Sequence, residues 1–420
     1  MALFDSLFGV KKRKAAAEAE LEKEKAEKHA QQVAKETEAH KDFAWPGLSR
    51  LNVFVSKDVE METIQDPLTP ERKAEIGPMI FEPELKPERF HDLTLQEILF
   101  LETSTALANH AAPIEHYESI KQSVHNAFLN RLRSAEKLYA IYDSSCGYPL
   151  IDSGFVLVYL EKDHAEKASE LYNQQNRRTQ VVELPGLNAP QQEDTPTQMK
   201  FFDYLYFMGA ENIMIDNGWY KGFVKRSEIS APFYINNPEP EKIPPYNPGL
   251  NFVLTDYIEE LRWHVKYEKR DAILRQKFQR IMSMIPKANF IMPVRNIPAE
   301  EDNNGENAEN RIQIPMVRLN DKNLLPVFSD MFEFSKKFAN TDYKPTRASF
   351  QSLEKFMPNY DGFIVNPNGQ GLVVEKRPKP ENGTPSEQAQ PASDSTQAAA
   401  PAEAEKEASN VIKMSDHQEQ

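Results

Sequence analysis

The sequence predicts an α/β (α+β) protein of two tandem small α/β domains with mixed sheets, a helical N-terminal arm and a disordered C-terminal tail. The first observation is a strand–turn–strand hairpin, in which the turn signal Asn366–Gly369 separates two β-rich runs, 363–365 and 372–374. A second hairpin of this kind lies around Asp216–Gly218, between the runs 213–215 and 222–224. Because helix-like and strand-like segments precede both hairpins, one module is expected to occur twice.

Length and composition bound the class of protein. A chain of 420 residues suggests two domains with extensions, and a 40% hydrophobic content is enough for packed cores. The net charge of -14 argues against nonspecific binding to nucleic acid. The single cysteine, Cys146, excludes an intramolecular disulfide and a cysteine-rich metal site. With so little cysteine, a reducing cytoplasm is the expected location. No apolar run approaches the roughly 20 residues of a membrane span.

The arm, residues 1–41, divides into two parts. Met1–Val10 is apolar, with Leu3, Phe4, Leu7 and Phe8 on one helical face, and the basic cluster Lys11–Lys14 follows it. A signal peptide has the opposite order, so this segment is either a frayed terminus or a weak contact to an anionic membrane surface. Residues 11–41 are rich in Ala, Glu and Lys without a coiled-coil seam, which predicts a solvated helix or a disordered arm.

The first domain is expected over residues 93–235, after a Pro-rich, extended lead-in over 42–92 that includes a candidate strand at Leu51–Val55. Thr94 and Glu97 form a capping box for a helix, and a second helix is expected from about Pro113 to Glu136. The remaining expected elements are strands at 138–142, 155–160 and 179–183, helices at 164–172 and 201–208, and the first hairpin.

A cluster of prolines marks a linker over residues 236–250, before a second domain over 251–377. One long helix is expected there, from Thr255 to Met284, and Pro286 ends it. Strand-like runs then follow in the same order as in the first domain, apart from an acidic, Asn-rich insertion from Ala299 to Arg311 that we expect to be a solvated loop. Residues 378–420 contain no aromatic residue and predict a disordered tail.

The second domain resembles the SseB family, whose members are called enhanced serine sensitivity proteins. The resemblance rests on Val327–Asp330, where a strand leads into a helix, and on Gly362–Gly369, which contains the Asn-Pro turn. It covers about residues 270–377. A degenerate counterpart lies at about 120–230, with Val158–Glu161 and Ile215–Asn217 at the matching places. The resemblance implies a small α/β domain without established enzymatic activity, and it assigns no catalytic residues.

The sequence contains no pattern that requires a cofactor, a metal or catalysis. The histidines are scattered, Cys146 lies in a turn without a base beside it, and Gly369–Gly371 lacks the helix that a phosphate-binding loop needs. The basic residues between Lys269 and Arg280 predict a solvated helix face. The candidate interaction residues belong to the two hairpins: Asp216, Asn217, Trp219, Tyr220, Asn366 and Asn368. An exposed Trp219–Tyr220 pair would be an interaction feature, and burial of the pair is the equal alternative.

These observations favour a non-enzymatic module that binds a protein or a peptide of unknown identity, by strand-edge pairing or in a groove beside a hairpin. The alternative is a hydrolase-like enzyme with a pocket between the two domains. A deep, polar pocket that holds a carboxylate with a shifted pKa would favour the enzyme. A second alternative is a peripheral membrane adaptor that binds through residues 1–14.

Overall fold

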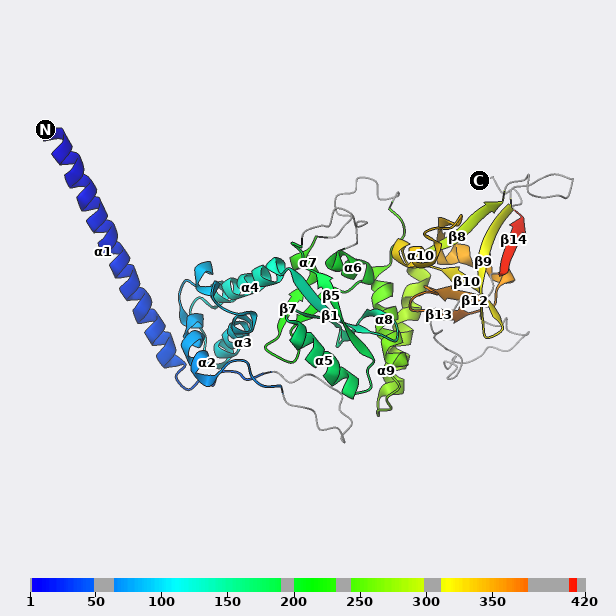
Figure 1. Cartoon of the computed structure of the whole chain (residues 1–420), viewed down its shortest axis with the longest axis horizontal. Helices are drawn as coiled ribbons and strands as arrows, with labels where there is room; N and C mark the ends of the chain where they lie inside the picture. Colours follow the sequence, from blue (N-terminus) through cyan, green and yellow to red (C-terminus); the bar gives the residue numbers. More distant parts are fainter. Residues whose placement is uncertain are drawn as a thin grey trace.

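The computed structural model describes residues 2–48, 64–189, 200–231, 243–297, 311–376 and 408–413. It contains a long N-terminal helix and two mixed sheets, and helices α8 and α9 lie between the sheets (Figure 1). The predicted fold class is therefore confirmed. The expected strand at Leu51–Val55 lies outside the described residues, as does the insertion at Ala299–Arg311 except for its last residue. The same holds for the tail at 378–420, apart from strand β14 (Ala408–Lys413), which pairs with β9.

The N-terminal arm is one continuous helix, α1 (Ala2–Ala39), which projects away from the rest of the protein (Figure 1). Its C-terminal end is fixed to the body. Glu36 and His40 are buried there, and the His40 ring stacks on Phe81 with 4.7 Å between ring centroids. The His40 Nε2 atom also lies 3.0 Å from the carbonyl oxygen of Ala112. Among the side chains of the arm that the structure describes, the buried ones are therefore those at its C-terminal end.

The lead-in differs from the extended segment that the prolines suggested. It contains helix α2 (Pro70–Ile76) and two 3₁₀ helices, η1 (Gly77–Phe81) and η2 (Pro87–Phe90). Each begins with proline at its first or second position, where the missing N–H costs no hydrogen bond. The prolines therefore start short helices here. Phe81 and Phe90 are buried in the first hydrophobic core.

The first sheet has the order β5–β1–β4–β6–β7, in which β4 and β6 are parallel and the other pairs are antiparallel. Short strands β2 and β3 pair with β1 and β4. The elements in chain order are α3 (Leu95–Ala111), α4 (Tyr117–Ser134), β1 (Lys137–Asp143), β2 (Tyr148–Pro149), β3 (Ile151–Asp152), β4 (Phe155–Tyr159), α5 (Lys162–Gln174), β5 (Thr179–Pro185), α6 (Phe201–Met208), β6 (Asn212–Ile215), β7 (Gly222–Lys225) and α7 (Arg226–Ile229).

Two sequence signals in this half are confirmed in detail. Thr94 caps α3, and both hydrogen bonds of its capping box with Glu97 are present. The apolar stripe of α4 is buried as its spacing predicted; it consists of Ile120, Val124, Phe128 and Leu132. The local pattern therefore determines which face of this helix pair packs on the sheet.

The second sheet has the order β11–β8–β9–β10–β12–β13, with β10 and β12 parallel. Its elements are α8 (Pro248–Arg262), α9 (Arg270–Met284), η4 (Ile285–Lys287), β8 (Asn289–Ile297), β9 (Arg311–Leu319), β10 (Lys322–Val327), α10 (Met331–Phe338), β11 (Lys344–Ser349), α11 (Phe350–Leu353), η6 (Met357–Asn359), β12 (Gly362–Val365) and β13 (Leu372–Glu375). Helix α8 begins at Pro248, inside the segment that was expected to be a linker.

The single long helix expected from Thr255 to Met284 is wrong, because α8 ends at Arg262 and α9 begins at Arg270. Long-range contacts explain the break. The Trp263 indole is buried and donates a hydrogen bond of 2.9 Å to the carbonyl oxygen of Gln175. The Arg270 guanidinium donates to the carbonyls of Glu260, Leu261 and Trp263, which compensates the open end of α8.

The two halves have the same layers. In the first half, α3 and α4 share a core with one face of the sheet, and α5 packs on the other face. In the second half, α8 and α9 share a core with one face, and α10 packs on the other. Both sheets continue from a parallel pair, β4–β6 or β10–β12, into an antiparallel hairpin. The main difference is β9, which stands between β8 and β10.

Candidate functional site

The Asn-Pro turn of the second half fixes the ends of two parallel strands. Asn366 follows β12 with a φ of 51°, in the left-handed region that asparagine adopts more readily than most residues. Its backbone N–H donates to the carbonyl of Val327 at 2.9 Å, and its Oδ1 accepts a hydrogen bond of 2.9 Å from the Ser329 N–H. Its Nδ2 donates to Ser329 Oγ and to Gln370 Oε1, both at 2.9 Å. Every polar atom of this buried side chain is therefore used.

Asp216 holds the matching place in the first half. Its φ is 53°, and its N–H donates to the carbonyl of Val158 at 3.0 Å. Its Oδ1 accepts from the Leu160 N–H at 3.3 Å, and its Oδ2 accepts from Gln96 Nε2 at 2.8 Å. His164 Nδ1 lies 3.3 Å from the same Oδ2, and its ring stacks on Trp219 with 4.1 Å between centroids. Both turns thus join the ends of a parallel strand pair through one short polar side chain.

Most of the candidate interaction residues lie inside the protein. Asp216, Asn217, Trp219, Tyr220 and Asn366 are buried, whereas Asn368 is exposed. The Trp219–Tyr220 pair is buried, as one of the two alternatives from the sequence predicted. The Tyr220 hydroxyl lies 3.0 Å from Asp66 Oδ2, and Asn217 Nδ2 donates to the Tyr172 hydroxyl at 3.1 Å. These side chains organise the hairpins from within, and a direct interaction role for the hairpins stays a prediction.

The second turn contacts the first half through Tyr148 of β2. The Tyr148 hydroxyl lies 2.9 Å from Glu333 Oε1 and 3.1 Å from Gln370 Oε1, and Lys336 Nζ donates to it at 3.0 Å. Gly369 lies so close that a Cβ atom added there would overlap the Tyr148 hydroxyl. The Asn-Pro turn therefore forms part of the junction between the halves. Sequence reasoning missed Tyr148, because no signal marks a tyrosine whose partners lie 185 or more residues away.

Helix α8 is the other part of this junction. Asn251 Nδ2 donates to the Phe207 carbonyl at 2.9 Å in the first half and to Asp330 Oδ2 at 2.7 Å in the second. Thr255 Oγ1 accepts from Gln370 Nε2 at 3.1 Å. One turn further along, Glu259 Oε2 accepts from the Ile151 N–H at 2.9 Å. One helix therefore hydrogen-bonds with both halves.

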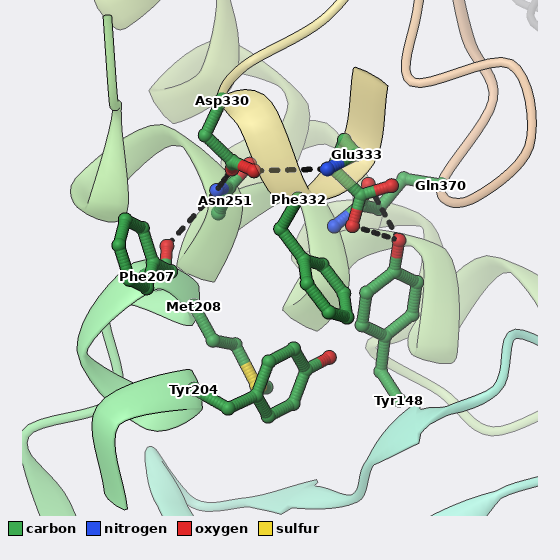
Figure 2. Close-up of a pocket in the computed structure, with 9 residues that line it drawn as sticks. All are labelled: Tyr148, Tyr204, Phe207, Met208, Asn251, Asp330, Phe332, Glu333 and Gln370. Carbon is green, nitrogen blue, oxygen red and sulfur yellow. Dashed lines mark hydrogen bonds between the residues drawn. The ribbon is translucent and has the colours of Figure 1, made fainter. Parts of the chain in front are cut away.

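A pocket lies where the halves meet, and we call it the junction pocket. Figure 2 shows the side chains that line it: Tyr148, Tyr204, Phe207, Met208, Asn251, Asp330, Phe332, Glu333 and Gln370. Its interior space is about 10 Å³, which is room for about one water molecule. Asn251, Asp330, Glu333 and Gln370 are buried polar residues, whereas Phe332 is 37% exposed.

Aromatic rings continue from the pocket toward the surface, where Phe332 and Tyr246 are exposed, Tyr204 and Tyr206 are half-buried, and Phe207 is buried. Phe332 packs against Tyr204, with 5.1 Å between ring centroids. Phe207 lies 6.5 Å from Tyr246, which also lies 6.0 Å from Tyr206. We call these five rings the junction aromatic surface. Both halves contribute to it, because Phe332 belongs to α10, Tyr246 precedes α8, and the other three rings belong to α6.

Burial shifts the pKa values of three side chains that line the junction pocket, Glu333, Tyr148 and Tyr204. Burial raises the pKa of Glu333, although the Lys336 ammonium group 2.7 Å from Oε1 opposes the shift. Burial and the nearby Glu333 carboxylate raise the pKa values of Tyr148 and Tyr204 well above their usual range, so both phenols are neutral at pH 7. The Glu333 Oε2 atom is buried and has no hydrogen-bond partner among the described residues.

The surroundings of Cys146 and of the basic residues between Lys269 and Arg280 point to structural roles for them. Burial raises the pKa of the Cys146 thiol well above its usual range, which makes it a poor nucleophile. Within the expected basic face, Lys277 pairs with Asp256 at 2.9 Å and with Glu260 at 3.4 Å. The described residues include no group of side chains suited to hold a metal ion, and no described helix is long and apolar enough to cross a bilayer.

Replacing Glu259 by Gln is expected to change how stability depends on pH. Burial raises the pKa of this carboxyl well above 4.5, and nearby Asp143 adds to the shift. Unfolding then releases a proton at neutral pH, so the parent loses stability as the pH rises from the unfolded-state pKa toward the folded one. Urea unfolding of Glu259→Gln and the parent at pH 5 and pH 8 should show the variant gaining relative stability at pH 8. Parallel pH profiles would contradict this assignment.

A comparison with known protein families finds one match, which lies in the second half of the chain. Residues 272–377 match the family model described as the SseB protein N-terminal domain. The match runs from α9 through β13 and covers about a quarter of the chain. No curated protein and no solved structure matches the chain significantly.

Proposed function

We propose that this chain is a non-enzymatic module that binds a protein or peptide partner through the junction pocket and the junction aromatic surface. The observation that carries the proposal is the exposed Phe332 ring, which packs on Tyr204 beside a polar pocket formed by both halves. Aromatic side chains around a small desolvated centre are typical of the residues that dominate protein interfaces. A reducing, cytoplasmic location is part of this proposal, and the single cysteine supports it.

We further propose that residues 93–235 form a second SseB-like domain, in tandem with the domain over 251–377. Three features support it: the shared layers, the shared parallel pair that continues into a hairpin, and the matching hydrogen bonds of Asp216 and Asn366. In this arrangement, the binding surface is a product of the duplication, because residues of both domains line it.

The pocket is too small for a metabolite. Sites for small molecules enclose roughly 300–1,000 Å³, whereas the space here is about 10 Å³. A partner would therefore lie over the aromatic rings and place only the tip of one side chain into the pocket. Glu333 lines the pocket, and its buried carboxyl is the acceptor that we propose for a donor on that tip, such as an amide or an ammonium group.

The test is selection from a random peptide library displayed on phage, with the intact chain as target, followed by affinity measurement on selected peptides. Replacing Phe332 by Ser should weaken these peptides at least about tenfold, which is the effect of a modest hot spot. The matched control is Phe223→Ser, because Phe223 is 47% exposed on β7 of the first half. Equal affinities for both variants, or no enriched peptide, would contradict the proposal.

A hydrolase-like enzyme is the second candidate, and one observation favours it. The junction pocket holds Glu333, a buried carboxyl with a raised pKa, and such shifts are typical of general acids and bases. Its contacts with Tyr148 and Lys336 also explain a structural role at the junction. Ester or peptide hydrolysis by the intact chain that is lost in Glu333→Gln but kept in Phe223→Ser would favour the enzyme.

A further inference from the structure

The N-terminal end of α1 combines apolar and basic residues in one helical segment. At roughly 100° per residue, Leu3, Phe4, Leu7 and Phe8 occupy an arc of about 140°. The same spacing assigns Asp5 and Ser6 to the opposite side of a helix, and the basic cluster Lys11–Lys14 follows within the next turn of the sequence. The helical backbone over these residues is continuous, so the apolar arc and the basic cluster belong to one element.

The rest of α1 works as a spacer. A helix of 38 residues is about 57 Å long at 1.5 Å per residue. Its C-terminal end is fixed by the buried Glu36 and His40, and the opposite end projects away from both sheets (Figure 1). Beyond the basic cluster, α1 alternates acidic and basic residues, with ion pairs such as Lys28–Glu24 at 2.8 Å. The apolar arc is therefore held at a distance from the acidic body.

The distribution of charge suggests what this end contacts. Residues 2–14 carry four basic side chains and one acidic side chain, a net charge of +3. Because the whole chain carries -14, the remainder carries -17. An anionic surface repels the body and attracts this end. A bilayer that contains acidic lipids combines an anionic surface with an apolar interior. Each basic residue near that surface contributes about 1 kcal/mol to the binding free energy. Apolar side chains next to that cluster insert below the headgroups.

We propose that the first helical turns of α1, residues 2–14, bind in the plane of an anionic lipid bilayer. Contact is reversible, because the apolar arc spans only about two turns and lacks a lipid chain. The inference goes beyond the proposed function, because it concerns a separate surface and a different class of partner. In combination, the arm recruits the chain to a membrane, and the junction aromatic surface belongs to a separate part of the molecule.

The test is sedimentation of the intact chain with vesicles of phosphatidylcholine, with or without phosphatidylserine. We expect binding only to the acidic vesicles, with a marked decrease when salt is raised. Two variants separate the contributions: Phe4→Ser with Phe8→Ser removes apolar area, and replacing Lys11–Lys14 by Gln removes the charge. Each should reduce the bound fraction at least about fivefold. Leu21→Ser is the matched control, because Leu21 is 52% exposed on the same helix outside the segment.

Three results would overturn the inference. Equal binding to neutral and acidic vesicles would exclude electrostatic recruitment, and unchanged binding of both variants would exclude this segment. Pelleting without vesicles, checked by sedimentation velocity, would show that α1 associates with other copies of the chain instead. Circular dichroism of the variants verifies that the helix persists. Peptide binding in the Phe332→Ser test does not involve α1, so the two proposals fail independently.

Discussion

Replacing Gly209 by Ala should destabilise the protein by about 3–5 kcal/mol, because two penalties act at one position. Gly209 ends α6 with a φ of +75°, in the left-handed region that disfavours a side chain. In addition, a Cβ atom there would overlap the carbonyl oxygen of Pro248, at the start of α8. Backbone atoms cannot move aside as a flexible side chain can, so α6 and α8 would have to separate.

The control for this prediction is Gly154→Ala. Gly154 has a similar φ of +87°, but an added Cβ would have no atom within 4 Å. It should therefore cost only the backbone penalty, about 1–2 kcal/mol. Urea unfolding of the two variants and the parent measures the difference. Equal losses would mean that the contact between α6 and α8 yields easily and that the junction is less rigid than its packing indicates.

Replacing Asn366 by Ala should cost a similar amount, about 3–5 kcal/mol, because several buried groups each lose a hydrogen bond at once. The Ser329 N–H and Gln370 Oε1 lose their bonds to this side chain, each of 2.9 Å, and a left-handed backbone position receives a residue that tolerates it less well. The ends of β10 and β12 would then lose their side-chain link.

Asn368→Ala is the matched control, since Asn368 lies two residues away in the same turn and is exposed. Its change in the free energy of unfolding should stay within about 0.5 kcal/mol. Asn366→Asp is informative as well. It keeps an acceptor for Ser329 but loses the two donor bonds, so its loss should fall between those of the other variants. A loss at Asn366→Ala as small as that at Asn368→Ala would contradict the role of this side chain.

Local signals in the sequence predicted the fold class, both hairpins and the capping box at Thr94. These features depend on neighbours in the chain: turn residues between β-rich runs, or a threonine three residues before a glutamate. The break between α8 and α9 was not predictable in this way, since apolar residues continue on both sides of it. It depends on Trp263 reaching Gln175 and on Arg270 binding the carbonyls at the end of α8.

In the candidate site, too, the features set by neighbouring residues were predictable and those set by long-range contacts were not. The sequence identified Asp216 and Asn366 as special, and their turn chemistry is confirmed, but it assigned them to the surface. Hairpin turns are often exposed, and only the tertiary structure shows that other side chains cover these two. Tyr148, Phe332 and Gly209 carried no signal at all, because their importance arises from contacts between the two halves.

The dual role of α8 has a consequence for how the molecule unfolds. Asn251 and Thr255 complete the polar interior of one half, while Glu259 and Trp263 bond to the other. Removing the first half would take away the partners of Glu259 and Trp263 and expose the buried Glu259 carboxyl to water. We therefore expect the two halves to melt in one cooperative transition, and a fragment starting at residue 251 to lose order rather than behave as an autonomous domain.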